Sequence, residues 1–360
     1  MITFLTFVIV FGVLIIVHEF GHFIVAKRQG VKVECFSVGF GPCLYKILKN
    51  KTLYKINAIP FGGYVKMAGD NLGERKGKPD EYLSKTPLAR AKIIFCGPLL
   101  NYLFGFLCFW WIFFVGYPTI PAEIGGVMEG YGAERAGLRK GDRIVSVDGR
   151  DINSWEELQS FIYTQEPSAV VNLGVMRNNK EFLKSIQLQE SQLDDQMGGK
   201  RSVPLLGITP EVSETIKVKY GFFKSALMGM EKTKVLTQIT YKALWRMLTG
   251  ALSLRESVTG PIGIFYITAK AAETGIIAVL NLMGVLSISL AIFNLLPLPI
   301  LDGGHLALLF IEKIKGRQIS PKIEHRITQT GFVLIVTLAV LVAYNDILRF
   351  FGDKIGSFFK

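Results

Sequence analysis

The sequence is poor in cysteine and in charged side chains. Only four of its 360 residues are cysteine, and no two of them have C-x-x-C spacing. No disulfide is predicted, and all four thiols, Cys35, Cys43, Cys96 and Cys108, are interpreted as structural. Charged residues make up 19% of the chain and hydrophobic residues 50%, with a mean hydropathy of +0.36. This composition predicts a membrane protein.

The first 26 residues contain no Lys or Arg. The apolar run 4–17 therefore lacks a basic segment before it, and it also lacks a small-residue cleavage site after it, so a signal peptide is not expected. Three later runs, 91–117, 276–300 and 331–351, are also long enough to cross about 30 Å of hydrocarbon. The predicted fold class is a polytopic α-helical membrane protein with four transmembrane helices, a membrane-associated β region and an inserted α/β domain.

Basic residues gather in two segments, one after the first span and one between the third and fourth. The first segment carries Lys27, Arg28, Lys32, Lys46, Lys49, Lys51, Lys55 and Lys66; the second carries Lys313, Lys315, Arg317, Lys322 and Arg326. The positive-inside rule predicts that both segments are cytoplasmic and that both termini lie outside. The net charge of +12 is explained by orientation and by contact with the lipid bilayer. No nucleic-acid-binding motif is found, and no nucleic-acid partner is expected.

The end of the first apolar run carries His18-Glu19-Phe20-Gly21-His22. Positions i and i+4 share one face of a helix, so His18 and His22 can reach a single zinc ion while Glu19 lies beside it as a candidate base. Ionisable groups in a spanning helix cost roughly 2.5–3.5 kcal/mol each, which indicates a compensating role such as metal binding. The motif predicts a zinc protease whose active site lies within the membrane.

Catalytic zinc sites usually have three protein ligands, so a third is sought elsewhere. Pro297 and Pro299 break the helical pattern near a membrane boundary, and irregular backbone at that depth is tolerated where it is buried or lines a cavity. Asp302 ends this segment and is the natural candidate; by topology it lies at the same cytoplasmic end as His18 and His22. His305 is an alternative ligand, although a role at a helix start or behind the ligands is also open.

Residues 27–90 are predicted to contain short strands, 33–38, 53–59 and 61–67, separated by Gly and Pro. The exposed edge of Phe61-Gly62-Gly63-Tyr64 could hold an extended substrate by strand addition, because a helical substrate must unwind before its peptide bonds can be attacked. The alternative is a small sheet that only packs against the helices.

Residues 118–197 have the composition of a soluble α/β module. Ser154-Trp155-Glu156-Glu157 predicts a capping box before a helix at 158–162, and Asn178-Asn179 joins two predicted strands, 169–176 and 181–188. This module, and above all the run from Ala136 to Ile144, resembles a PDZ domain. Its position between two spans predicts that it lies outside.

The whole chain is accordingly divided into nine segments. They are a first transmembrane helix with the H-E-x-x-H motif (1–26), a cytoplasmic or membrane-associated β region and loop (27–90), a second transmembrane helix (91–117), an extracytoplasmic PDZ domain (118–197), a segment with a linker at 198–220, an interfacial amphipathic helix at 222–252 and an interfacial or re-entrant segment at 261–269 (198–275), a third transmembrane helix with the Leu-Asp-Gly motif (276–303), a cytoplasmic loop (304–330), a fourth transmembrane helix (331–351) and a tail (352–360).

Five motifs together resemble the site-2 protease family of intramembrane zinc metalloproteases, in particular its bacterial RseP-like branch. They are His18 to His22, Phe61-Gly62-Gly63-Tyr64, Gly97-Pro98-Leu99-Leu100-Asn101, Gly260-Pro261-Ile262-Gly263 and Asn294 to His305. The resemblance implies Zn²⁺ bound by His18, His22 and Asp302, catalysis by Glu19 and a substrate clamp at Asn294; the role of Asn101 stays open. It also implies the bacterial inner membrane, with the active site near the cytoplasmic side.

The family resemblance implies regulated intramembrane proteolysis of single-span membrane proteins, such as an anti-sigma factor, and removal of remnant signal peptides. The single PDZ module would recognise a new C-terminus or exclude bulky outer domains. A catalytically silent zinc-bearing scaffold that presents the PDZ domain is the alternative, but a scaffold has no need of Glu19 beside the metal. An ion-coupled transporter would be expected to show internal repeats, and none is seen.

Overall fold

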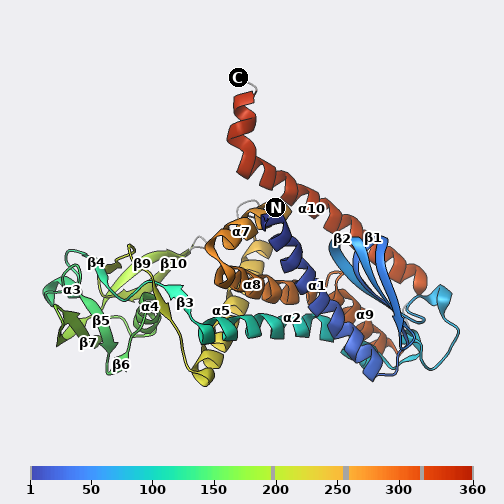
Figure 1. The fold of residues 1–360 in the computed structure, drawn as a ribbon, viewed down its shortest axis with the longest axis horizontal. Helices are drawn as coiled ribbons and strands as arrows, with labels where there is room; N and C mark the ends of the chain where they lie inside the picture. The colour runs from blue at the N-terminus through green and yellow to red at the C-terminus, as the bar shows by residue number, and fades with distance from the viewer. Residues whose placement is uncertain (1, 196–198, 254–258, 317–319, 359–360) are drawn as a thin grey trace. The chain divides into compact units, whose positions relative to one another are not determined.

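The computed structural model describes residues 2–195, 199–253, 259–316 and 320–358 (Figure 1). The chain forms two compact units: unit 1 contains residues 1–111 and 227–360, and unit 2 contains residues 112–226. Two long helices, α2 (Pro87–Val115) and α5 (Phe222–Leu248), each contribute residues to both units.

Unit 1 is mainly helical. Besides α2 and α5 it contains α1 (Ile2–Arg28), β1 (Val33–Lys49), β2 (Thr52–Met67), the short 3₁₀ turns η1 (Leu72–Glu74) and η2 (Tyr82–Ser84), α7 (Pro261–Thr274), α8 (Ile276–Asn294), α9 (Asp302–Lys315) and α10 (Pro321–Phe358). Four of these helices, α1, α2, α8 and α10, include stretches that are long and apolar enough to cross a membrane. Unit 1 therefore supplies the polytopic part of a membrane protein.

Helices α1, α2 and α8 pack together around Val10, Leu14, Cys108 and Met283. Glycines bring α2 close to both of its neighbours. A Cβ on Gly21 would overlap the carbonyl of Cys96, and a Cβ on Gly105 would lie 2.9 Å from the carbonyl oxygen of Gly284. Small residues allow such close backbone approach between apolar helices. The elements that carry the site are thus held by direct helix contacts.

The β region is built from two long strands rather than from three short ones. Strand β1 meets β2 twice: its segment 33–38 lies between 53–56 and 63–67 of β2. The pairing shifts register between Val38 and Phe40 and between Phe40 and Cys43, where the sequence places Gly39 and Gly41. Glycine therefore bends strand β1 without ending it, because Gly39 and Gly41 adopt positive φ angles.

The segments around the third predicted span differ from the expected boundaries. Helix α8 ends at Asn294, and the chain is irregular until α9 begins at Asp302. The expected cytoplasmic loop 304–330 is largely helical, because α9 continues to Lys315, where Gly316 ends it with φ 65°, and α10 already begins at Pro321. Hydropathy separates spanning helices from the rest of the chain, and an amphipathic helix such as α9 does not reach a spanning threshold.

The predicted second span also starts and ends earlier than expected. Helix α2 begins at Pro87, where Thr86 accepts a hydrogen bond from the Ala89 N–H, and it ends at Val115. Gly116 then turns the chain with φ 100° into β3 (Tyr117–Thr119).

The predicted re-entrant segment 261–269 forms helix α7, which packs against α1, α8 and α10. Its N-terminus has no side-chain cap of its own. Instead, the carboxylate of Asp346 on α10 accepts hydrogen bonds from the backbone N–H groups of Gly260 (3.1 Å) and Gly263 (2.9 Å). A Cβ on Gly260 would lie 2.6 Å from Asp346 Oδ2, so this close approach requires glycine. The Gly260-Pro261-Ile262-Gly263 motif thereby receives a structural explanation.

Unit 2 is an α/β module. It contains β3, β4 (Ile124–Val127), α3 (Gly132–Arg135), β5 (Arg143–Val147), β6 (Arg150–Asp151), α4 (Trp155–Tyr163), β7 (Val170–Arg177), β8 (Lys180–Gln187), β9 (Gln189–Asp195), β10 (Gly199–Leu205), β11 (Ile208–Pro210) and β12 (Ile216–Val218). Four strands form a sheet in the order β6-β5-β7-β8. Its core is aliphatic, with Ile144, Leu158, Leu173 and Ile186 almost completely buried.

The local signals in this module are confirmed. Ser154 caps α4 by accepting a hydrogen bond from the Glu157 N–H, and the Glu157 carboxylate accepts from the neighbouring Asn153 N–H. Asn178 and Asn179 both have positive φ angles, 50° and 59°, at the tight turn between β7 and β8. These are the angles that a two-residue hairpin turn needs.

Residues 198–220 were expected to be a linker, but the described part of this segment belongs to unit 2. Strand β11 pairs with β4, and β12 pairs with β3, with Val218 opposite Tyr117. Val203, Leu206 and Tyr220 are buried. The module therefore extends past residue 197, because its last strands bury apolar side chains against its first ones. Residues 196–198 lie outside the described part of the chain.

Candidate metal centre

His18, Glu19 and His22 lie on α1, whose apolar sequence favours a long helix. The spacing of four residues puts both imidazoles on one face, and their Nε2 atoms are 3.3 Å apart. Helix α2 faces this pair closely. A Cβ on Gly97 would overlap the His22 imidazole, so only glycine leaves room for the ring at this position.

Asp302 reaches the same point from the other end of the chain. It is the first residue of α9, after the irregular segment that contains Pro297 and Pro299. Its Oδ2 lies 3.2 Å from His18 Nε2 and 3.6 Å from His22 Nε2. Among the described residues these three form a group suited to a metal ion, with side chains only 12–18% exposed. The structure thus brings together the two histidines and the aspartate that the sequence proposed.

The spacing of the three ligand atoms fits a zinc ion. A tetrahedral zinc with bonds of about 2.0–2.1 Å holds its ligand atoms about 3.3 Å apart. The three separations of 3.2, 3.3 and 3.6 Å are close to that value. A water molecule or a substrate would complete the coordination, as in other catalytic zinc sites.

The hydrogen bonds around the ligands also favour a cation at this point. His22 Nδ1 lies 2.9 Å from the carbonyl oxygen of Ile93, to which it can only donate, so the neutral ring carries a lone pair on Nε2. That lone pair faces the Asp302 Oδ2 atom, which is buried without a hydrogen-bond partner among the described residues. Electron-rich atoms this close repel one another unless a positive charge lies between them.

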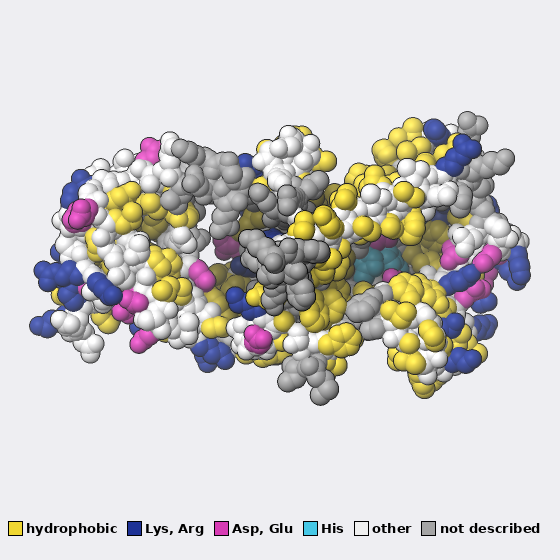
Figure 2. Space-filling model, turned by 90° about the horizontal axis from the view of Figure 1, so that it is seen from above, with side chains coloured by type: hydrophobic (Ala, Val, Ile, Leu, Met, Phe, Trp, Pro, Cys, Tyr) yellow, Lys and Arg dark blue, Asp and Glu magenta, His cyan; other side chains and the backbone are white. Residues whose placement is uncertain are grey.

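Glu19 lies beside the three ligand atoms and lines a cavity of about 230 Å³. The cavity is also lined by His22, Val65, Met67, Asp70, Tyr82, Ile93, Ile94, Asp302 and His305. The backbone N–H of Val65 on β2 donates a hydrogen bond to the Glu19 carboxylate. Figure 2 shows histidine side chains at the bottom of a hollow bordered by hydrophobic side chains. The acid therefore has access to a space in which a peptide bond could be placed beside the metal.

Two further polar residues line this cavity. His305 lies one turn after Asp302 on α9 but is not part of the three-residue metal group. Asp70 was not singled out by the sequence, because nothing distinguishes it from the other carboxylates of a polar stretch. Its Oδ2 accepts a hydrogen bond from the Met67 N–H, and its Oδ1 is buried without a partner among the described residues. Burial raises the pKa of Asp70, and the Met67 hydrogen bond offsets only part of this.

The structure separates the predicted strand residues by face. A Cβ on Gly63 would lie 3.3 Å from Glu19 Cγ, so the backbone of Gly63 lies near the candidate catalytic acid. Tyr64 points elsewhere: its ring stacks on the ring of Phe40, and the two ring centroids are 6.2 Å apart. Gly62 has a φ angle of 115°, and Phe61 lies in β2 with a side chain outside the described part of the structure. The strand thus meets the site through Gly63 and Val65.

Asn294 is the last residue of α8 and is half-buried, but it is not one of the described residues that line the cavity. Its predicted part in binding substrate remains a prediction.

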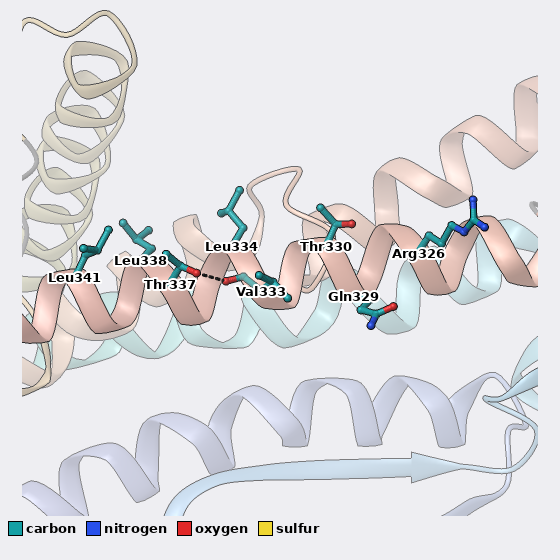
Figure 3. A pocket seen from close by; sticks show the side chains of 8 residues that line it. All are labelled: Arg326, Gln329, Thr330, Val333, Leu334, Thr337, Leu338 and Leu341. Carbon is teal, nitrogen blue, oxygen red and sulfur yellow. Dashed lines mark hydrogen bonds between the residues drawn. The ribbon is translucent and has the colours of Figure 1, made fainter.

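A larger groove of about 740 Å³ follows one face of α10 (Figure 3). It is lined by Arg326, Gln329, Thr330, Val333, Leu334, Thr337, Leu338 and Leu341. None of the candidate site residues is among them, so the size of a groove does not identify the site in this chain.

The sequence pattern of peptidase family M50 matches residues 6–338. A putative zinc metalloprotease of Rickettsia conorii is 34% identical, covering 98% of this chain and 100% of its own. The regulator of sigma E protease of Haemophilus influenzae is 28% identical, over 96% of this chain and 98% of the relative's length. The zinc metalloprotease RasP of Bacillus licheniformis is 27% identical, over 97% of this chain and 99% of the relative's length. The crystal structure of a PDZ domain from a Listeria innocua SdrC-like protein matches 26% of this chain and 97% of its own, with 24% identity and a TM-score of 0.21.

Proposed function

Since the chain belongs to peptidase family M50 and is a zinc metalloprotease, we propose that His18, His22 and Asp302 bind the zinc ion and that Glu19 is the catalytic acid and base. The observation that carries these roles is the convergence of three ligand atoms, 3.2–3.6 Å apart, from two segments that are 280 residues apart in the chain. Glu19 is the only carboxylate of the motif on α1.

The reaction is hydrolysis of a peptide bond. The bound zinc ion supplies Lewis acidity for the scissile carbonyl and lowers the pKa of water toward about 7. Glu19 accepts the proton of the attacking water and then delivers it to the nitrogen of the leaving amine. The hydrogen bond from Val65 N–H holds the carboxylate between the metal centre and β2. Hydrophobic side chains border this hollow (Figure 2), and an apolar border lowers the local dielectric and strengthens these charge interactions.

We propose that the substrate lies as an extended strand along β2 at Phe61-Gly62-Gly63-Tyr64. No described strand other than β1 pairs with β2, so the outer edge of the 63–67 segment is open. Two N–H groups of this segment are already used, Val65 by Glu19 and Met67 by Asp70. The open part of the edge is therefore the part before Val65, which adjoins Glu19 through Gly63. Asn294 is proposed to clamp the substrate from the end of α8.

The proposed substrates are single-span membrane proteins such as an anti-sigma factor, in keeping with the sigma E regulator named among the relatives, and remnant signal peptides. The proposed location is the bacterial inner membrane, with four spans and both termini outside. Basic residues follow the end of α1, where Lys27 and Arg28 form the last turn, so the positive-inside rule orients this end and the metal centre toward the cytoplasm.

The central test compares wild type with Glu19→Gln in liposomes that contain a generic transmembrane peptide. Loss of a general acid and base lowers kcat by about 10²–10⁴-fold, and zinc content should stay at the wild-type level. Glu34→Gln is the matched control, since Glu34 is only half-buried, lies outside the cavity and pairs with Lys32. Normal cleavage by Glu19→Gln, or absence of zinc from folded wild type, would contradict the proposed roles.

The strand proposal is tested by disulfide trapping. In a background with the exposed Cys43 replaced by serine, Phe61→Cys should cross-link to a substrate with a single cysteine near its cleavage site. Leu48→Cys, an exposed position on β1, serves as the control and should not. Equal trapping at both positions would remove the strand from the mechanism.

We also propose that unit 2 excludes substrates with bulky outer domains rather than binding their C-termini. A clean deletion removes residues 118–217, because Tyr117 and Val218 are paired neighbours and a short glycine linker can join them. The deletion should make full-length substrate as cleavable as trimmed substrate. If full-length substrate remains resistant, the size filter is the wrong explanation.

A further inference from the structure

The motif Gly97-Pro98-Leu99-Leu100-Asn101 lies on α2 opposite the two histidines. Gly97 faces His22, and Asn101, one turn later, faces His18, with its side-chain nitrogen 3.4 Å from His18 Nδ1. We propose that Asn101 is a positioning residue that fixes the ring orientation and the tautomer of His18 so that its Nε2 can bind zinc. This inference rests on the proposed function, which makes His18 a zinc ligand.

Asn101 is fully buried, with 0% exposure, and its backbone carbonyl oxygen accepts a 2.7 Å hydrogen bond from the Ser287 hydroxyl on α8. The side-chain Oδ1 is buried and has no partner among the described residues. A buried amide left partly unpaired is unfavourable, and an apolar side chain of the same shape would avoid that cost. Its presence therefore calls for a reason other than packing.

The tautomer of His18 supplies that reason. If the amide nitrogen donates to Nδ1, the ring proton must sit on Nε2, the atom that faces Asp302, and the ring cannot bind a metal there. Amide oxygen and nitrogen have nearly the same shape, so the side chain turned by 180° fits the same space. In that orientation Oδ1 accepts a hydrogen bond from Nδ1–H, and the lone pair of Nε2 is free for zinc. Residues that hydrogen-bond a metal-binding histidine without binding the metal themselves orient its ring in this way.

His22 has the equivalent partner, but from the backbone. Its Nδ1 donates to the carbonyl of Ile93, also on α2, at 2.9 Å. A side-chain substitution at Ile93 does not remove that carbonyl. Helix α2 thus provides one acceptor for each imidazole, and only the one at Asn101 can be removed by mutation.

Two substitutions of nearly the same shape separate orientation from packing. Asn101→Asp keeps an acceptor toward His18, whereas Asn101→Leu removes it. If Asn101 only fills space, leucine should be tolerated and a buried carboxylate should be harmful. If Asn101 orients His18, the order is reversed.

The experiment is a chelator titration of purified full-length protein, read as zinc bound and not as cleavage. Asn101→Leu should raise the zinc dissociation constant by about 10–100-fold, the usual effect of losing an outer partner, while Asn101→Asp should stay much closer to wild type. Asn101→Ser, too short to reach His18, should behave like the leucine variant and serves if leucine does not fold. Ser287→Ala is the control, because it removes only the bond to the Asn101 backbone carbonyl and should leave zinc affinity nearly unchanged.

Wild-type affinity in both Asn101→Leu and Asn101→Ser, or a greater loss in Asn101→Asp than in Asn101→Leu, would overturn the proposal. Failure of the proposed function has a different signature, because wild type itself would then bind no zinc. The two outcomes are therefore distinguishable in the same titration.

Discussion

Helices α4 in unit 2 and α7 in unit 1 begin in different ways. Ser154 precedes α4 directly and accepts a hydrogen bond from Glu157 N–H, three residues later. Helix α7 has no such residue, and Asp346, more than 80 residues away, accepts from its first N–H groups. Water can satisfy an uncapped helix end at a protein surface but not in a buried or apolar setting. The helix of unit 1 therefore takes its cap from another helix.

One ion pair from each unit illustrates the same difference. In unit 2, Arg177 donates two hydrogen bonds of 2.6 Å to Asp142, and the arginine is 27% exposed. Burial raises the pKa of Asp142, but hydrogen bonds from Arg177 and the Arg139 N–H outweigh it, so the pKa lies below its usual value. In unit 1, Arg90 on α2 and Glu312 on α9 are both nearly buried, 222 residues apart. This buried pair of unit 1 thus joins two helices that are far apart in the chain.

The largest effect is expected at the metal centre, where contacts between distant segments converge. Asp302→Asn replaces an anionic ligand by a neutral amide. Zinc affinity should therefore fall by more than the ~10–100-fold that is typical of losing a hydrogen-bond partner of a ligand, and cleavage should be lost. His305→Gln is the control, since His305 lines the cavity outside the three-residue group. Zinc content and hydrogen exchange are measured together, and unit 2 should keep its wild-type exchange. Zinc loss in His305→Gln would add this residue to the ligands.

The Arg90–Glu312 pair comes next. Arg90→Leu leaves the Glu312 carboxylate buried without this partner, and breaking a buried ion pair costs about 3–5 kcal/mol. The melting temperature in detergent should fall clearly. The double variant Arg90→Leu/Glu312→Leu should recover most of the loss, because two apolar side chains leave no buried charge. If the single variant melts like wild type, this pair does not hold α9 against α2.

A smaller loss is expected from Asp346→Ala. This substitution leaves the N–H groups of Gly260 and Gly263 without their acceptor. The free energy of unfolding should fall by about 2–3 kcal/mol, which is more than the loss of an ordinary helix cap and less than the full loss of two buried hydrogen bonds. Hydrogen exchange should rise first at the start of α7. Asp346→Asn keeps one acceptor oxygen and should show an intermediate effect. Unchanged exchange at Gly263 in the alanine variant would show that α7 does not depend on α10 for its cap.

The same contrast explains what the sequence could predict. The α4 cap, the Asn178-Asn179 turn and the i, i+4 pair of histidines are local patterns, and the structure contains all three. The two prolines that mark an irregular segment near a membrane boundary point to Asp302, which the structure places beside both histidines. Membership of the site-2 protease family, predicted from motifs spread along the chain, is confirmed.

What the sequence could not predict depends on contacts between residues far apart in the chain. Asp70 and the Ile93 carbonyl have no local pattern that marks them as parts of the site, and Asp346 is one carboxylate in an apolar helix. Strands β11 and β12 have no recognisable strand pattern in the sequence, because each is only three residues long and pairs with strands about 80 to 100 residues earlier. The spacing of apolar residues along the chain does not indicate which distant residues will be in contact.

The smallest predicted effect concerns the local cap of α4 in unit 2. Ser154→Ala removes the acceptor for Glu157 N–H and should cost about 1 kcal/mol, the usual value for a serine cap. Because this contact lies within one turn of helix, faster hydrogen exchange should be confined to α4, with zinc affinity and the exchange of α7 unchanged. Ser154→Asp is the matched variant, since aspartate is an equally good cap and should restore protection. A change in zinc affinity with Ser154→Ala would mean that local contacts in unit 2 also influence the metal centre, and the contrast between the two units would no longer hold.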